Sequence, residues 1–409
     1  IKTKDPKVFP IYININKSKF WQHLKNLLTG KEVFFSQNFD AGDVSSSLDD
    51  ALLGFSSKVK KHKNIEIFNF FGVDLRRILS AYVAKSSIGE MALLENSIKK
   101  MYGIFDVQKP CLALSQHALG YSYALGEMCS IENIPSLLIT HGTHTLQKED
   151  KYAQIEWGEH AKTIINARFS HSAIQSPIAD EFFNSLDDKY STGLKTGPLI
   201  YSRSKHDEPL PELKEWLIGK MHVDKKIIIH AGTPKGNSAI RPWVYETIDE
   251  YVRNINDLID VVDSLKDVYL IVRFRPSEGL NKADFSKLVK PSDNYGIYSD
   301  GPFDDYLAAS DLLVSYSSTT IEEALQNDVV VLQYDHDDKY MHIQAPVIIE
   351  GQELDTNPIY YCGNKGELKN SINVILKNID LIKSEKHKWD LYRYPVDDKL
   401  EWLDKLLSK

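Results

Sequence analysis

Short apolar runs alternate with longer segments of helical spacing along most of the chain. This alternation predicts βαβ units and parallel sheets, so we expect an α/β protein. Residues 163–183 have the pattern of a strand, a short turn and a helix that begins at Pro177. In the rest of the first half, strands are predicted at 31–38, 64–72, 111–116 and 135–142, and helices at 18–29, 74–103 and 117–131.

The pattern breaks at residues 195–213, which contain three prolines and a polar cluster. A second series of elements follows, with strands predicted at 225–232, 267–276, 295–300, 311–318 and 328–335, and helices at 240–266, 302–309, 319–326 and from 367 onward. We therefore expect a first domain over 1–200, a linker over 201–213, a second domain over 214–385, and a helical segment over 386–409 that returns to the first domain.

Composition supports a folded chain of about two domains, since 409 residues exceed one module of ordinary size. The net charge of −8 argues against a nucleic-acid partner. Cys111, Cys129 and Cys362 form no C-x-x-C pair, which favours a reducing cytoplasm over a disulfide framework. The first residues lack the pattern of a signal peptide, and no run of about 18 apolar residues occurs, so we expect a soluble protein.

Doubly wound sheets bind ligands beyond the carboxyl ends of their strands. The strongest such signal is SDLLVSYSSTTIEEAL at 310–325, where an apolar strand leads into hydroxyl residues that open a helix. Unpaired amides and the helix dipole favour an anion there, so we expect a phosphate site. Its candidate residues are Ser317, Ser318, Thr319, Thr320 and Glu322. The alternative interpretation is an ordinary helix cap.

Two further strand ends carry cationic side chains. Arg273 and Arg275 are two residues apart, so both are expected on one face of their strand, where guanidinium forks suit phosphate or carboxylate. The loop at 231–238 combines Gly232, which lets backbone approach a ligand, with the charge of Lys235. Surface ion pairs and a tight strand-to-helix turn are the respective alternatives.

The candidate catalytic residues lie in the first half. His141 follows an apolar run and precedes a glycine, which suits a histidine that takes a proton from an acceptor hydroxyl, although a structural histidine is the alternative. Asp40 and Asp43, after the first predicted strand, are candidate bases or carboxylate nucleophiles, with helix caps or solvated turn residues as the alternative. His141 and His144 have no evident third partner for a zinc site. Asp335-His-Asp337 favours an exposed turn or a cleft-lining pair over a metal site, so no metal is expected.

Four stretches resemble bacterial glycosyltransferases of the GT-B architecture that build surface polysaccharides: LLITHGTHT, TGPLIYS, LIVRFRP and SDLLVSYSSTTIEEAL. The resemblance implies two Rossmann-like lobes with a central cleft. It also maps a catalytic histidine onto His141 and phosphate binding onto Ser317, Ser318 and Thr319. Polyol-phosphate polymerases usually have His-Pro where this chain has Arg275-Pro276, and an arginine there suits a donor with its own carboxylate, as in CMP-Kdo-dependent Kdo transferases.

The resemblance implies a metal-independent enzyme, working without a cofactor, that moves a sugar, best assigned as Kdo from CMP-Kdo, to a lipid-linked glycan of lipopolysaccharide or capsule. Such an enzyme would work in the cytoplasm at the inner membrane face, with peripheral contact through the basic segments 58–63 and 97–100. A polyol-phosphate or hexose transferase, a nucleotide-sugar epimerase on the same fold, and a non-enzymatic two-lobed solute-binding protein are the alternatives. Inverting or retaining chemistry and the oligomeric state are left open.

Overall fold

The computed structural model describes residues 11–12, 35–36, 46–64, 68–70, 73–82, 88–107, 109–140, 144–147, 150–201, 224–234, 241, 243–275, 280–397 and 399–407. The chain divides into two compact units, one formed by 1–113 with 118–134 and the other by 114–117 with 135–409. The expected linker at 201–213 lies outside the described residues except for Tyr201. The expected domain bounds therefore remain a prediction.

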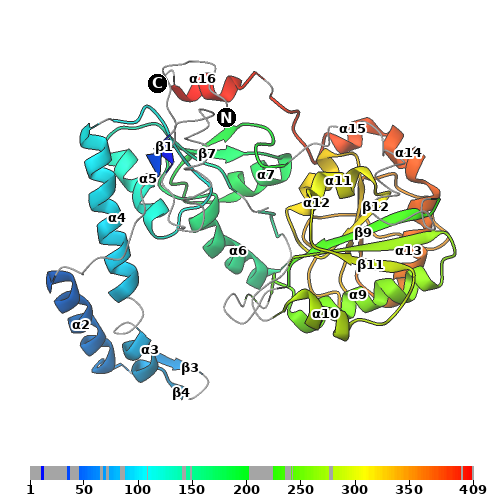
Figure 1. The fold of residues 1–409 in the computed structure, drawn as a ribbon, viewed down its shortest axis with the longest axis horizontal. Coiled ribbons are helices and arrows are strands. Elements are labelled where there is room, and N and C mark those ends of the chain that lie inside the picture. The colour runs from blue at the N-terminus through cyan, green and yellow to red at the C-terminus, as the bar shows by residue number, and fades with distance from the viewer. Residues whose placement is uncertain are drawn as a thin grey trace. The chain divides into compact units, whose positions relative to one another are not determined.

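The first unit is mainly helical in its described part (Figure 1). Its helices are α2 (Ser46–Lys60), α3 (Arg76–Tyr82), α4 (Ile88–Val107) and α5 (Tyr121–Ile131). Its short strands pair as β1 (Ile11–Tyr12) with β2 (Phe35–Ser36) and β3 (Asn69–Phe70) with β4 (Val73–Asp74). Met101 of α4 packs against Ala124 and Met128 of α5 in a small apolar core. Helix α2 was not predicted, and the helix predicted at 18–29 lies outside the described residues.

A four-stranded sheet has the order β5-β6-β7-β8. Its strands are β5 (Ala113–Ser115), β6 (Ser136–Leu138), β7 (His171–Ile174) and β8 (Thr192–Lys195), and the pairs β6–β7 and β7–β8 are parallel. Helix α7 (Pro177–Ser185) begins at the proline as predicted, with Ser176 as its cap. Helix α6 (Lys151–Ile164) was missed because its buried stripe is partly alanine, which gives a weak apolar signal.

The second unit also contains a parallel six-stranded sheet with the order β11-β10-β9-β12-β13-β14. Its strands are β9 (Lys226–Gly232), β10 (Val268–Phe274), β11 (Tyr295–Tyr298), β12 (Leu312–Ser315), β13 (Val330–Tyr334) and β14 (Ile359–Cys362). The first five confirm the predicted strands, and β14 was not predicted. Strands β10 and β11 extend the sheet on one side of β9 and β12–β14 on the other, so the chain changes direction between β9 and β12.

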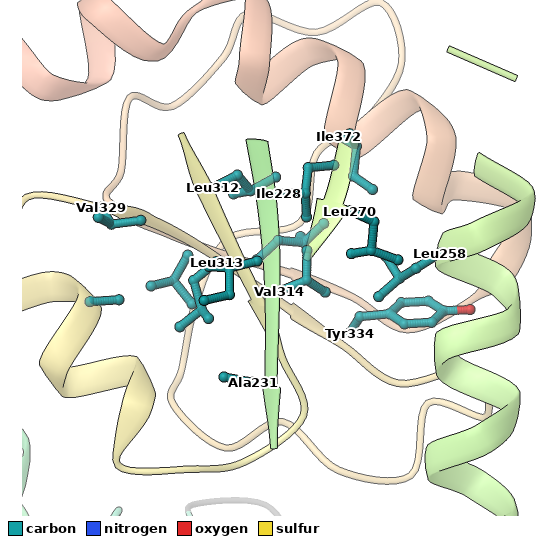
Figure 2. Packing of buried hydrophobic residues seen from close by; sticks show 14 of the residues in the cluster. Ile228, Ala231, Leu258, Leu270, Leu312, Leu313, Val314, Val329, Tyr334 and Ile372 are labelled. Carbon is teal, nitrogen blue, oxygen red and sulfur yellow. The ribbon is translucent and has the colours of Figure 1, made fainter. Parts of the chain in front are cut away.

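Helices cover this sheet because their apolar faces need burial. Helix α9 (Ile248–Asp263) starts at a capping box of Thr247 and Glu250, eight residues later than predicted, and buries Leu258 against the sheet. Figure 2 shows Leu258 beside Leu270 of β10 and Tyr334 of β13. The other helices are α10 (Lys282–Leu288), α11 (Phe303–Ala308), α12 (Thr320–Gln326) and α13 (Lys365–Lys377). These buried aliphatic contacts make the sheet a firm base for the loops at its carboxyl edge.

The C-terminal part is helical, as predicted from residue 367 onward, with α14 (Ile379–Ser384), α15 (Lys386–Trp389) and α16 (Glu401–Leu407). Between α15 and α16, the Tyr394 hydroxyl donates to Asp180 Oδ2 over 2.9 Å. Lys195 pairs with the same carboxylate at 2.6 Å. Lys195 Nζ of β8 also lies 5.5 Å from the centre of the Tyr394 ring, so the tail contacts both α7 and β8. Within the described residues, no helix combines the length and apolarity that crossing a bilayer requires.

Candidate functional site

The change of direction between β9 and β12 marks the expected ligand site. In a doubly wound sheet of this order, which numbers 3-2-1-4-5-6 along the chain, ligands bind outside the carboxyl ends of the strands at that point. The Ser315 hydroxyl donates to the Ala231 carbonyl over 2.7 Å and joins the two strand ends. Beyond them, β9 ends at Gly232 and β12 leads into the hydroxyl segment.

The hydroxyl segment, Ser317 to Thr320, follows β12 and is half-buried throughout. Ser318 Oγ accepts the Thr320 amide at 3.3 Å, and its carbonyl accepts the Ile321 amide at 3.0 Å. Thr319 makes no side-chain capping bond. Thr320 Oγ1 has no hydrogen-bond partner among the described residues. Ser318 thus forms the turn that begins α12. The side chains of Thr319 and Thr320 make no hydrogen bond to the start of that helix.

Glu322, in the first turn of α12, is buried at 3% exposure. Its carboxylate accepts the hydroxyl of Ser176, the cap residue of α7, and the hydroxyl of Tyr201 at 2.5 Å. Both donors come from the segment that precedes the six-stranded sheet. Glu322 therefore holds α12 to the end of the four-stranded sheet region, a role that sequence spacing did not indicate.

The two predicted arginines have different surroundings. Arg273 Nη2 donates to the Gly301 carbonyl over 2.7 Å, and its guanidinium lies 4.9 Å from the centre of the Tyr306 ring. Arg275 is exposed and forms no ion pair or hydrogen bond with the described residues. Arg273 is thus held by protein groups, whereas Arg275 presents a cation at the carboxyl end of β10.

Several predicted residues cannot be placed. His141, Asp40, Asp43 and Lys235 lie outside the described residues, so their proposed roles stay predictions. His144 is fully buried and packs against Trp157 and Phe182, with ring centres 5.5 Å and 5.2 Å away. No group of three or more metal-binding side chains occurs among the described residues.

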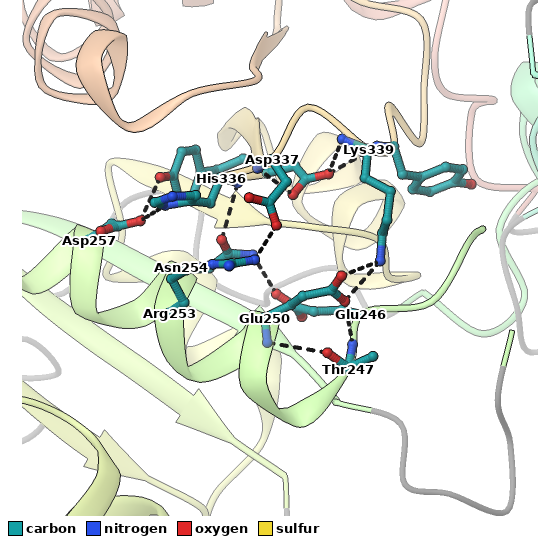
Figure 3. Close-up of polar contacts among 12 residues, drawn as sticks. Glu246, Thr247, Glu250, Arg253, Asn254, Asp257, His336, Asp337 and Lys339 are labelled. Carbon is teal, nitrogen blue, oxygen red and sulfur yellow. Dashed lines mark hydrogen bonds and ion pairs between the residues drawn. The ribbon is translucent and has the colours of Figure 1, made fainter. Parts of the chain in front are cut away.

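The Asp335–Asp337 turn after β13 is tied to protein groups. Asp335 accepts the amides of Lys339 and Tyr340 at 2.8 Å and 2.9 Å. Asp337 pairs with Arg253 of α9. Figure 3 shows this turn beside the start of α9. The segment forms a turn, but Asp335 is buried in it and the expectation of an exposed turn was wrong for that residue.

Sequence reasoning missed a buried carboxyl next to this turn. Glu246 is 5% exposed, and its Oε1 accepts Asn254 Nδ2 over 2.7 Å (Figure 3). Burial is the main cause that raises the pKa of Glu246 to about 8, with smaller contributions from Asp335 and Glu250. Glu250 is paired with Lys339 at 2.8 Å, so that cation is already engaged. Glu246 is therefore a neutral acid at pH 7.

Other polar groups near Glu246 are also enclosed. His230 of β9 is 2% exposed, and burial lowers its pKa to about 4, so the ring is uncharged. Tyr251 of α9 lies edge-on to it, with ring centres 5.4 Å apart. Burial, and then the carboxyls of Asp335 and Glu246, raise the pKa of Tyr316. No local motif in the sequence links these positions, which the fold alone brings together.

No protein-family model matches the chain. Among solved structures, the UDP-GlcNAc 2-epimerase of Methanocaldococcus jannaschii in complex with UDP-GlcNAc and UDP is similar, with 12% identity, a TM-score of 0.50, and coverage of 95% of this chain and 96% of that one. A UDP-GlcNAc 2-epimerase from Neisseria meningitidis bound to UDP-GlcNAc has 10% identity, a TM-score of 0.46, and coverage of 97% and 98%. The glycotransferase of kitacinnamycin has 12% identity, a TM-score of 0.42, and coverage of 80% and 84%.

The fold is that of GT-B enzymes. The M. jannaschii alignment, together with the parallel sheets, confirms the α/β GT-B expectation. At 12% identity this likeness concerns the fold alone. Among curated sequences, a dynein heavy chain-like protein 1 of Plasmodium falciparum is 21% identical over 289 residues, which are 68% of this chain and 6% of the relative. The chain thus matches a small part of that relative's length.

Proposed function

We propose that this chain is a nucleotide-sugar-dependent glycosyltransferase. The observation that carries the proposal is the strand order of the six-stranded sheet, which puts Gly232, the hydroxyl segment and Arg275 at the carboxyl ends of β9, β12 and β10. Nucleotide ligands bind at that edge in sheets of this order. Half-buried hydroxyls and a cation there suit the diphosphate or phosphate of a nucleotide sugar.

The proposed chemistry stabilises a departing phosphate without a metal. Ser317, Thr319 and Thr320 would donate hydroxyl hydrogen bonds, while Arg275 and Lys235 would supply positive charge. Glu322 would orient the start of α12 through its present contacts. His141, or one of Asp40 and Asp43, would activate the acceptor hydroxyl or attack the sugar.

The proposed donor is CMP-Kdo. Arg275 supports this choice because it is exposed and unpaired with respect to the described residues, and a guanidinium binds a sugar carboxylate in a bidentate fashion. The proposed acceptor is a lipid-linked glycan of lipopolysaccharide or capsule. Lys58, Lys60, Lys61 and Lys63 are all exposed, which would allow contact with an anionic membrane surface.

Epimerisation of a nucleotide sugar is the second candidate. It is favoured by the similarity to UDP-GlcNAc 2-epimerases over nearly the whole chain. An epimerase would bind the donor at the same sheet edge and would need no glycan acceptor. A polyol-phosphate or hexose transferase would use the same edge with another donor.

Donor binding followed by product analysis tests the proposal. Thermal unfolding would be measured with CMP, CMP-Kdo, UDP and UDP-GlcNAc, because a ligand at 100 times its Kd adds about 2.7 kcal/mol to the free energy of unfolding. We expect the largest stabilisation with CMP-Kdo, and sugar transfer only when a lipid-linked glycan is added. Conversion of UDP-GlcNAc without an acceptor would favour the epimerase, and no response to any nucleotide would refute both.

A further inference from the structure

The carboxyl edge of the six-stranded sheet contains polar atoms that the protein itself leaves unsatisfied. Tyr251 and Tyr316 are 0% and 3% exposed, yet neither hydroxyl has a hydrogen-bond partner among the described residues. His230 Nδ1 is buried and unpartnered in the same part of the chain. An unsatisfied buried polar group costs about 1–3 kcal/mol, so the three at this edge call for an explanation, and a bound ligand would supply the missing hydrogen bonds.

His230, Tyr251 and Glu246 lie together at the end of β9, and Tyr316 is near enough for the Glu246 carboxyl to raise its pKa. A Cβ atom added to Gly232 would lie 3.6 Å from the His230 ring, 3.7 Å from the Tyr251 ring and 3.9 Å from Glu246 Oε2. Glu246 Oε1 accepts Asn254, but Oε2 receives no hydrogen bond from the described part of the chain. We call His230, Glu246, Tyr251 and Tyr316 the polar cluster.

The charge of the polar cluster decides which ligand group fits it. Glu246 is neutral at pH 7 because burial raises its pKa to about 8, and the nearby carboxyls of Glu250 and Asp335 disfavour further negative charge. Lys339 is bound to Glu250 and is not available to balance a phosphate. A neutral acid and phenols both donate and accept hydrogen bonds, as sugar hydroxyls do.

We propose that the polar cluster binds the hydroxyl groups of the glycosyl ring of the nucleotide sugar, with Glu246, Tyr251 and Tyr316 as its hydrogen-bonding residues. The inference rests on the proposed function, and it assigns a specificity site separate from the phosphate-binding hydroxyl segment. Discrimination follows because a sugar that lacks the matching hydroxyl leaves buried polar groups unpaired.

Isosteric variants test the assignment. Calorimetry would measure the affinity of wild type, Tyr251→Phe and Tyr316→Phe for whichever of CMP-Kdo and UDP-GlcNAc wild type binds more tightly, and for its free nucleotide. We expect each variant to lose roughly 5- to 50-fold in affinity for the nucleotide sugar and less than twofold for the nucleotide. Tyr190→Phe is the control, because Tyr190 is 48% exposed and outside the polar cluster.

Glu246 is tested by a conservative pair of variants. Glu246→Gln keeps a neutral donor and acceptor and should bind the nucleotide sugar within about threefold of wild type at pH 7. Glu246→Leu has no such groups and should lose more than tenfold in affinity. The unliganded Tm of both phenylalanine variants should equal or exceed that of wild type, because they remove unsatisfied hydroxyls.

The results that would overturn the sugar-binding assignment differ from those that would overturn the proposed function. Phenylalanine variants that bind the nucleotide sugar like wild type, or that lose affinity for nucleotide and nucleotide sugar equally, overturn the sugar-binding assignment and leave the proposed function standing. A Tm lowered by several degrees in both variants would show that the hydroxyls have protein partners and would overturn it as well. Absence of any nucleotide or nucleotide-sugar binding by wild type overturns the proposed function and, with it, this inference.

Discussion

The Ser315 hydroxyl donates to the Ala231 carbonyl over 2.7 Å, and this bond connects the last residue of β12 to the residue before the end of β9. Ser315 is fully buried, so the bond is shielded from water. It fixes the spacing of the two strand ends from which Gly232 and the hydroxyl segment continue. The bond thus relates the stability of the sheet to the geometry of the proposed donor site.

Ser315→Ala should lower the free energy of unfolding by about 1 kcal/mol and also weaken nucleotide-sugar binding, because it removes the bond between the strand ends. Ser310→Ala is a matched control, since Ser310 is also buried and donates to a carbonyl, that of Tyr306, at 2.6 Å, but lies before β12. Denaturation and calorimetry should show similar destabilisation in both variants and weakened binding only in Ser315→Ala. Equal nucleotide-sugar affinity in the Ser315→Ala and Ser310→Ala variants would show that this bond does not affect the proposed donor site.

Arg275→Ala should weaken donor binding about tenfold without changing the Tm, because the guanidinium is exposed and forms no ion pair or hydrogen bond with the described residues. Lys282→Ala, which removes an exposed cation from α10, should leave both quantities unchanged. Arg273→Ala should instead lower the Tm, since it breaks the bond to Gly301 and the contact with Tyr306. Unaltered donor affinity in a folded Arg275→Ala variant would remove Arg275 from the site.

Glu322→Gln should destabilise the protein by about 1–3 kcal/mol, because the amide replaces one acceptor oxygen with a donor that faces a hydroxyl. A double-mutant cycle with Ser176→Ala, followed by urea denaturation, should give a coupling energy of at least about 0.5 kcal/mol. Additive effects would mean that the two side chains do not interact in solution. The same cycle with Tyr201→Phe tests the second bond.

The free energy of unfolding should fall with rising pH in one range, because of Glu246, and with falling pH in another, because of His230 and His342. The pKa of Glu246 is raised by burial to about 8, so the folded state binds more protons than the unfolded state above pH 4.5, and stability falls as the pH rises towards 8. Burial lowers the pKa of His230 to about 4 and of His342 to about 3, so stability falls as the pH decreases from 6.5 towards those values.

Urea denaturation at several pH values checks both windows. Glu246→Gln should flatten the decline between pH 4.5 and about 8 by an amount on the order of a few kcal/mol and leave the decline below pH 4.5 unchanged. If Glu246→Gln loses as much unfolding free energy with rising pH as wild type does, another group causes that loss.

The architecture of the six-stranded sheet was largely predictable because its strands are continuous apolar runs, as in β9 and β13, bounded by turn residues. Strand β14 was missed because Ile359–Cys362 is short and half aromatic, and it follows an irregular segment. Helix α6 was missed because Ala153 and Ala161 share its buried stripe with Trp157. Short or alanine-based buried faces give weak periodic signals.

The candidate site was predictable only where strand ends carry unusual residues in one local segment. The hydroxyl segment and Arg275 lie at strand ends as expected. The engagement of Arg273 by Gly301 depends on a loop 28 residues away, which spacing cannot reveal. Glu246 and Tyr251 lie at the start of α9 and Tyr316 follows β12, so no local motif connects all three before the chain folds.

The central place of β9 has a consequence for how the chain is made. One edge of β9 can pair soon with β10, but the other waits for β12, whose Ser315 lies 84 residues after Ala231. Contacts this distant in sequence slow folding. During synthesis an apolar strand edge is therefore exposed until β12 emerges, and this interval is when the nascent protein is most prone to aggregate.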